Sequence, residues 1–158
     1  MKNFKSRIKV RYAETDQMGV VHHGNYAQYV ELARCEWLEQ FGISYKEMEG
    51  EGIMLPVYEM AFKFIQPAFF DDEITIETKL KRAPTFKIEF EYDITRKNEL
   101  LAQGNTVLIF VNSETRKPIR CPKFILDKIQ EFSKPVVIDA GVFQFIYSEL
   151  PLDKFPEK

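Results

Sequence analysis

Reactive side chains are concentrated in one stretch of the sequence, residues 12–26. This stretch reads YAETDQMGVVHHGNY and holds two carboxylates, two histidines, two glycines and two tyrosines. A carboxylate can attack a carbonyl carbon or activate a water molecule. Where a helix begins after such a loop, its unpaired backbone N–H groups carry partial positive charge and can stabilise an oxyanion. The two features together predict a site for acyl transfer or hydrolysis.

A long helix is predicted directly after this stretch. From Tyr26 to Phe41 apolar residues recur at helical spacing, with polar residues between them. Asn25 is a candidate N-cap, and Gly42 is a candidate stop signal. The sequence therefore places the carboxylate of Asp16 on a loop that leads into the amino end of the helix.

The rest of the chain mostly alternates apolar and polar residues, which is typical of strands with one buried face. The predicted strands are residues 5–12, 58–64, 74–80, 86–95 and 101–111. Small residues at 102, 104 and 106 share one face of the last strand and favour close approach of another element, such as the long helix. A short helical stretch is expected at residues 44–49, and another helix opens at Pro122. We therefore expect an α+β fold, with an antiparallel sheet wrapped around one long helix.

Composition bounds the class of protein. The chain has 158 residues, 45% of them hydrophobic and 29% charged, which favours one globular domain. Its 22 basic and 24 acidic residues give a net charge of −2, which argues against a nucleic-acid partner. No apolar run approaches the roughly 18 residues of a membrane span, and the first residues lack the apolar core of a secretory signal. We expect a cytoplasmic protein with a domain at 1–132 and an apolar extension at 133–158 that packs on the domain or on a subunit interface.

Three motifs carry a resemblance to a known family. They are Y-x-E-T-D-x-x-G-V-V-x-H-x-x-Y with a following E-x-A-R over residues 12–34, F-x-x-P-A-x-x-D-D over 64–72 and K-P-x-R-x-P over 117–122. With these motifs the chain resembles the 4-hydroxybenzoyl-CoA thioesterase-like family, particularly its YbgC-type acyl-CoA thioesterase branch, over roughly residues 5–132. The resemblance implies the hotdog fold and hydrolysis of acyl-CoA to a carboxylic acid and CoA.

The resemblance also implies roles for individual residues. Asp16 matches the catalytic carboxylate, which acts as nucleophile or as general base. The backbone N–H of His23 matches the group that polarises the thioester carbonyl, and its side chain is expected to orient substrate or transfer a proton. Tyr12 is expected to position substrate or water. The candidate substrate-binding residues are Gly24, Thr85, Phe86 and Arg120.

The resemblance implies no metal and no prosthetic group. Coenzyme A, or the phosphopantetheine arm of a carrier protein, enters as part of the substrate. A homodimer or homotetramer is expected, with the site formed between two subunits. Another hotdog reaction (hydration or dehydration of an acyl thioester) and a non-catalytic acyl-thioester binding role stay open as alternatives, as do the acyl chain and its carrier.

Several neighbouring residues are expected to have ordinary roles. His22 and His23 are adjacent in sequence and lack a well-spaced third ligand, so they are not expected to share a metal. Glu14 is expected at the surface or in a hydrogen bond. Cys35 and Cys121 are too few for a disulfide framework and lack metal-ligand spacing.

Overall fold

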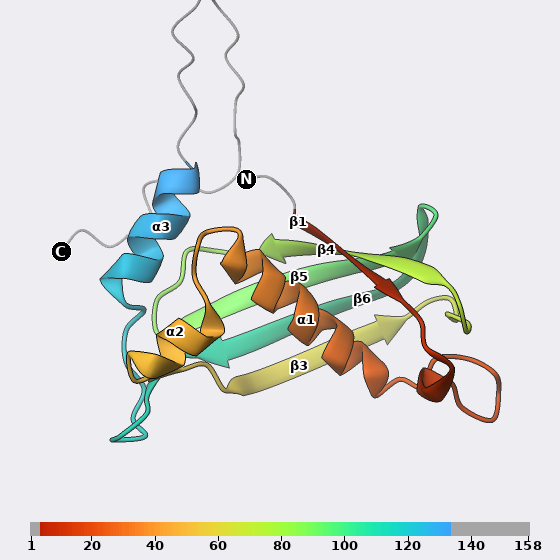
Figure 1. Ribbon diagram of the computed structural model, residues 1–158, viewed down its shortest axis with the longest axis horizontal. Coiled ribbons are helices and arrows are strands. Elements are labelled where there is room, and N and C mark those ends of the chain that lie inside the picture. Colours follow the sequence, from red (N-terminus) through yellow and green to blue (C-terminus); the bar gives the residue numbers. More distant parts are fainter. Residues whose placement is uncertain (1–3, 134–158) are drawn as a thin grey trace, which may run out of the picture.

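The computed structural model describes residues 4–133, which form an antiparallel sheet crossed on one face by the helix α1 (Asn25–Glu39), as Figure 1 shows. The five strands of the sheet are β1 (Phe4–Lys9), β3 (Val57–Phe64), β4 (Glu73–Leu80), β5 (Lys87–Arg96) and β6 (Glu99–Ile109). Their order is β1-β4-β5-β6-β3, and every neighbouring pair is antiparallel. The expected α+β architecture is therefore confirmed.

The remaining elements are short, and they correct two predicted boundaries. They are the 3-10 turn η1 (Tyr12–Glu14), α2 (Tyr45–Gly50), β2 (Ile53–Met54), β7 (Val111–Asn112) and α3 (Lys123–Ser133). The first strand ends at Lys9 rather than at residue 12, because the chain turns into η1. The last long strand ends at Ile109, and β7 pairs with β2 in a second small sheet. The proposed extension at 133–158 lies almost wholly outside the described residues.

The core lies between α1 and the inner face of the sheet. Trp37 is fully buried, and its ring meets the ring of Phe90 on β5 edge-on, with 5.0 Å between the centroids. Burying one such aromatic side chain stabilises the fold by about 1.5–3 kcal/mol. The predicted apolar stripe is confirmed in these buried residues of α1: Tyr26, Tyr29, Val30, Ala33, Trp37 and Leu38. Within the part of the chain that the structure describes, no helix is long and apolar enough to cross a bilayer.

The two ends of α1 differ in how well they were predicted. Gly42 stops the helix as expected: its φ of 66° lies in the left-handed region, and its N–H bonds to the carbonyl of Glu39 at 2.8 Å. The expected N-cap at Asn25 is wrong, because Asn25 is the first helical residue and Gly24 occupies the cap position. The side-chain amide of Asn25 instead donates a hydrogen bond of 2.8 Å to the backbone carbonyl of Glu14, at the other end of the reactive stretch.

Gly104 on β6 makes room for a side chain of the neighbouring strand. Its strand partners are Tyr92 on β5 and Phe62 on β3. A Cβ atom at position 104 would lie 2.6 Å from the ring of Phe62, well inside van der Waals contact. Gly104, which was expected to let the helix approach, thus makes room for the Phe62 ring. The Phe62 ring in turn packs against the ring of Tyr26 on α1, with 6.2 Å between the centroids.

Gly104→Ala is expected to destabilise the protein by about 1–3 kcal/mol, because the Phe62 ring must move out of its place. Gly50→Ala is the matched control: nothing lies within 4 Å of a Cβ there, so that change is expected to be neutral or slightly stabilising. Chemical denaturation of both variants measures the difference. Equal stability of the two variants would contradict this role of Gly104.

Candidate functional site

Asp16 and His23 line one pocket at the amino end of α1. The pocket has a volume of about 270 Å³ and lies between the reactive loop and the segment that follows β3. Its remaining lining is mostly apolar: Met18, Val20, Val21, Tyr26, Phe64, Ile65, Gln66 and Pro67. The wall from residues 64–67 was not among the expected site residues. It lies here because Val20 and Val21 of the reactive loop pair with Phe69 and Ala68, which come much later in the sequence.

The loop that carries Asp16 is closed by its own backbone. The Asp16 N–H donates to the carbonyl of Val20 at 2.9 Å, and the Gly19 N–H donates to the carbonyl of Asp16 at 2.9 Å. Gly19 has a φ of 74°, which a glycine adopts without strain. The Asp16 Oδ1 accepts the Met18 N–H at 2.8 Å, whereas Oδ2 has no hydrogen bond within residues 4–133. One oxygen therefore fixes the side chain, and the other is free to attack or to take a proton.

The entry of α1 presents one open backbone amide. The His22 N–H donates to the carbonyl of Glu14 at 2.9 Å, and the Asn25 N–H donates to the carbonyl of His22 at 3.0 Å. The Gly24 N–H donates to the His22 Nδ1 at 3.1 Å. Only the His23 N–H of this run has no acceptor among the residues described. Because the dipole of α1 adds partial positive charge, this amide suits a carbonyl oxygen that becomes negative.

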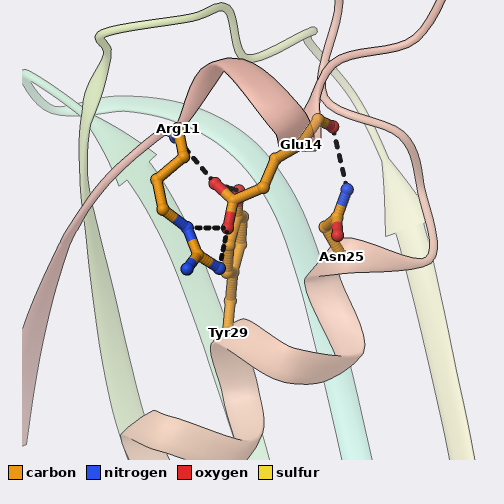
Figure 2. Close-up of polar contacts among 4 residues, drawn as sticks. All are labelled: Arg11, Glu14, Asn25 and Tyr29. Carbon is orange, nitrogen blue, oxygen red and sulfur yellow. Dashed lines mark hydrogen bonds and ion pairs between the residues drawn. The ribbon is translucent and has the colours of Figure 1, made fainter.

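Glu14 is buried beneath this loop and accepts hydrogen bonds on both carboxylate oxygens (Figure 2). Oε1 accepts two hydrogen bonds from the Arg11 guanidinium at 2.9 and 2.7 Å, and Oε2 accepts the Arg11 N–H and the Tyr29 hydroxyl, each at 2.8 Å. Burial alone would raise the pKa of Glu14, but these hydrogen bonds and the Arg11 charge together bring it below its ordinary value. The expectation of a hydrogen-bonding role is confirmed, and the alternative surface position is wrong.

Tyr29 keeps its proton in this arrangement. Burial, followed by the neighbouring Glu14 carboxylate, raises the pKa of the Tyr29 hydroxyl well above its ordinary value. The hydroxyl is therefore protonated at neutral pH and donates its hydrogen bond to Glu14. The Arg11–Glu14 spacing of three residues is the one sequence signal that points to this cluster, since it is the spacing of a capping interaction.

Tyr12 lies away from the pocket. Its side chain is 77% exposed, and its ring packs edge-on against Phe70 with 5.5 Å between centroids. The backbone carbonyl of Tyr12 accepts a hydrogen bond of 2.8 Å from the hydroxyl of Thr15, the residue that precedes Asp16. In a single chain, Tyr12 thus contacts the Asp16 loop through its backbone rather than through its side chain.

The other candidate substrate-binding residues gather around a second cavity of about 360 Å³. Thr85 and Arg120 line this cavity together with residues of α3, and the Arg120 guanidinium lies over the Phe86 ring at 5.1 Å. Strand β5 connects the two cavities. Phe86 lies just before its first residue, and Arg96 is its last residue. Arg96 donates to the carbonyl of Pro67, which lines the Asp16 pocket. A ten-residue strand spans about 30 Å. The two cavities therefore lie at opposite ends of the sheet, as the places of α3 and η1 in Figure 1 also show.

Among the described residues, the two adjacent histidines and the two cysteines form neither a metal site nor a thiolate nucleophile. The rings of His22 and His23 pack against each other, 4.1 Å apart and tilted by 31°. Within residues 4–133 no three His, Cys, Asp or Glu side chains come together as a metal site. Cys35 and Cys121 are both free, and burial raises the pKa of the Cys121 thiol to about 12. Neither thiol is held as a thiolate near the pocket.

Comparisons with known proteins agree with this architecture. Residues 10–129 match the model of the thioesterase-like superfamily. The chain is 33% identical to the putative acyl-CoA thioesterase YneP of Bacillus subtilis over 124 residues, which cover 78% of this chain and 90% of that protein. It is 28% identical to the acyl-CoA thioester hydrolase YbgC of Escherichia coli over 129 residues, which cover 81% of this chain and 96% of that protein.

Solved structures show the same arrangement of helix and sheet. The DHNA-CoA thioesterase of Staphylococcus aureus matches with a TM-score of 0.76 and 35% identity, over 82% of this chain and 87% of that one. The family model matches a range that includes the motif with Asp16 and His23. The chain therefore belongs to the thioesterase-like superfamily, a family of thioester hydrolases with the hotdog fold.

Proposed function

We propose that this protein is an acyl-CoA thioesterase, which hydrolyses acyl-CoA to a free carboxylic acid and CoA. The observation that carries the proposal is the pairing, in one mostly apolar pocket, of a free carboxylate oxygen on Asp16 with an open amide at His23. Hydrolysis of a thioester needs those two groups, a nucleophile or base and an oxyanion donor. The relatives YneP and YbgC, which are named as a putative acyl-CoA thioesterase and an acyl-CoA thioester hydrolase, support the same reaction.

In the proposed reaction, the thioester carbonyl oxygen accepts the His23 N–H. Asp16 then acts in one of two ways: it attacks the carbonyl carbon to form a mixed anhydride that water hydrolyses, or it takes a proton from an attacking water. In both routes a C–O bond forms, the C–S bond breaks, and the products are a carboxylate and CoA. A thiol of ordinary pKa, ~8.5, leaves readily, so little acid assistance is needed. The His23 imidazole, at the pocket lining, serves to orient the substrate or transfer a proton.

The proposed reaction needs no metal and no prosthetic group. The mostly apolar lining of the Asp16 pocket suits an acyl group. The Arg120 cavity suits the phosphates of CoA, because Lys123 lines it beside Arg120, against one acidic residue, Asp127. A substrate that uses both cavities must therefore bridge the two ends of a sheet.

A second copy of the chain could bring an Asp16 pocket and an Arg120 cavity close together. Of the two edge strands, β1 carries the exposed charged side chains of Lys5, Arg7 and Lys9, which discourage strand pairing. The other edge, β3, also carries exposed charges at Glu59 and Lys63, but it exposes more apolar surface, at Val57, Tyr58 and Phe64. We propose that two copies pair antiparallel along β3 about a two-fold axis, which turns the Arg120 cavity of one copy toward the Asp16 pocket of the other.

Asp16→Asn is expected to lower kcat for acyl-CoA hydrolysis by about 10²–10⁴-fold, because the amide is neither a base nor a nucleophile. The amide oxygen can still accept the Met18 N–H, so the loop and the affinity for acyl-CoA should be retained. Thiol release from short, long and aromatic acyl-CoAs measures the effect and identifies the acyl class. Carrier-protein thioesters form the second panel.

Two outcomes contradict this function. Undiminished hydrolysis by Asp16→Asn would remove Asp16 from the reaction. Tight binding of acyl-CoA without turnover by the unchanged protein, on both panels, would identify a binding protein instead. Single-turnover hydrolysis in ¹⁸O water then tests the nucleophilic role of Asp16. If water attacks Cγ of the mixed anhydride, the label enters the Asp16 carboxylate and the acid carries an unlabelled Asp16 oxygen, whereas the general-base route labels the acid and never Asp16.

Tyr58→Lys is expected to produce a monomer of low activity, because a charge on β3 opposes pairing of the two edges. The Tyr58 side chain is 72% exposed, so the fold of each chain should be unaffected. Phe124→Lys, which removes a partly exposed ring from α3, is the control and should keep the mass and the activity. Sedimentation and thiol release measure both variants. A fully active monomer would refute the shared site.

Arg120→Ala is expected to raise KM for acyl-CoA about tenfold with little change in kcat, because a contact between charged groups is lost far from the reacting carbonyl. Thioesters of N-acetylcysteamine, which lack the nucleotide, should be hydrolysed equally well by variant and unchanged protein. Arg7→Ala on the β1 edge is the control for loss of a positive charge. An equal rise of KM for both thioester types would place Arg120 outside the nucleotide site.

A further inference from the structure

Glu14 lies between β1 and Asp16 in the sequence, and it contacts the first turn of α1 in space. Figure 2 shows its side chain between Arg11 and Tyr29, with its backbone carbonyl directed toward the side chain of Asn25. Two of its contacts reach α1: the Tyr29 hydroxyl donates to Oε2, and the Asn25 amide donates to the backbone carbonyl, each at 2.8 Å. The same residue thus holds the helix through both its side chain and its backbone.

The two contacts on α1 are one helical turn apart. Asn25 and Tyr29 differ by four positions, so they share one face of the helix. A single hydrogen bond would tie Glu14 to this face of the helix at one point only. Two contacts on one face, a turn apart, fix both the position of the first turn and its rotation about the helix axis.

The backbone carbonyl of Glu14 also controls which amide stays open. It accepts the His22 N–H at 2.9 Å in addition to the side chain of Asn25. Glu14 therefore holds the residues on both sides of the His23–Gly24 pair. The His23 N–H is left without an acceptor in the described part of the chain because its neighbours are held by Glu14 and His22.

The backbone of the loop also holds Glu14 at a fixed position relative to Asp16. The Thr15 backbone bridges to Val21, and the Asp16 N–H bonds to the carbonyl of Val20, so the loop leaves Glu14 in one conformation. Only one residue separates Glu14 from Asp16. A shift of Glu14 relative to α1 would therefore change the distance between the Asp16 carboxylate and the His23 amide directly.

We infer that Glu14 is a positioning residue, which sets the separation between the Asp16 carboxylate and the open amide of His23 through its contacts with Tyr29 and Asn25. This inference rests on the proposed thioester hydrolysis. Charge-assisted hydrogen bonds are short and directional, which suits a group whose task is to fix geometry. The Arg11 guanidinium balances the buried charge, so the carboxylate stays ionised beside the helix.

The test compares two tyrosines that each use a buried hydroxyl in one hydrogen bond. Tyr29→Phe removes the 2.8 Å contact to Glu14, and Tyr92→Phe removes the 2.7 Å contact to Thr106 in the sheet. Both changes are expected to lower thermal stability by a similar amount. Only Tyr29→Phe is expected to lower kcat, about 10–100-fold at a temperature where both variants are fully folded, with KM changed less than twofold.

A second variant tests whether the contacts of Tyr29 and Asn25 both act through Glu14. Asn25→Ala removes the other contact of Glu14 with α1 and keeps a good helix former at that position. If both contacts set the same separation, the double variant with Tyr29→Phe should lose less kcat than the product of the two single losses. Gln28→Ala, on the exposed side of α1, is the control and should retain full kcat.

Hydrogen exchange supplies a readout that does not depend on turnover. Tyr29→Phe is expected to speed exchange of the amides at 15–26, whereas Tyr92→Phe is not. Unchanged kcat in Tyr29→Phe and Asn25→Ala, beside an inactive Asp16→Asn, would overturn the positioning role and leave the proposed function intact. Full activity of Asp16→Asn would overturn the proposed function instead, and the exchange of residues 15–26 would still decide whether Glu14 holds this junction.

Discussion

The junction between β1 and the amino end of α1 depends on the buried carboxylate of Glu14. An unpaired buried carboxylate is strongly destabilising, and here both oxygens are satisfied by Arg11 and Tyr29. Because Tyr29 belongs to α1, its hydrogen bond ties the amino end of the helix to Glu14, while the buried face of the helix packs on the sheet. The loop that carries Asp16 leaves from the same residue. The position of the amino end of α1 relative to Asp16 is thus set by one cluster of hydrogen bonds.

The sheet contributes the other half of the site. Residues 64–67, at the end of β3, form a wall of the Asp16 pocket, and Arg96 on β5 holds that segment through the carbonyl of Pro67. The helix contributes the open amide, and the sheet contributes the apolar surface for an acyl group. The second cavity, at the other end of β5, has the charge suited to a nucleotide. A substrate as long as acyl-CoA fits this division when two chains share one site.

The sequence was most informative where a local pattern determines the outcome. The apolar spacing of α1 predicted its buried face, and Gly42 marked its end, because both depend on neighbouring residues alone. The motif around Asp16 and His23 likewise placed both residues at the helix entry. The sequence was misleading at Asn25 and left Glu14 undecided, since their hydrogen bonds join segments whose contact the pattern does not show. The wall from residues 64–67 was missed for the same reason, since pairing of Val20 with Phe69 and of Val21 with Ala68 brings this segment to the loop.

In the proposed reaction the Asp16 carboxylate and the His23 amide act on the same thioester carbonyl. A crystal structure of the Asp16→Asn variant with an acyl-CoA bound would test this arrangement. We expect the carbonyl oxygen to accept the His23 N–H, with the side chain at position 16 beside the carbonyl carbon and the nucleotide at the Arg120 cavity of a second copy. A thioester bound with its carbonyl away from His23, or with its acyl group outside this pocket, would show that the two groups do not act together.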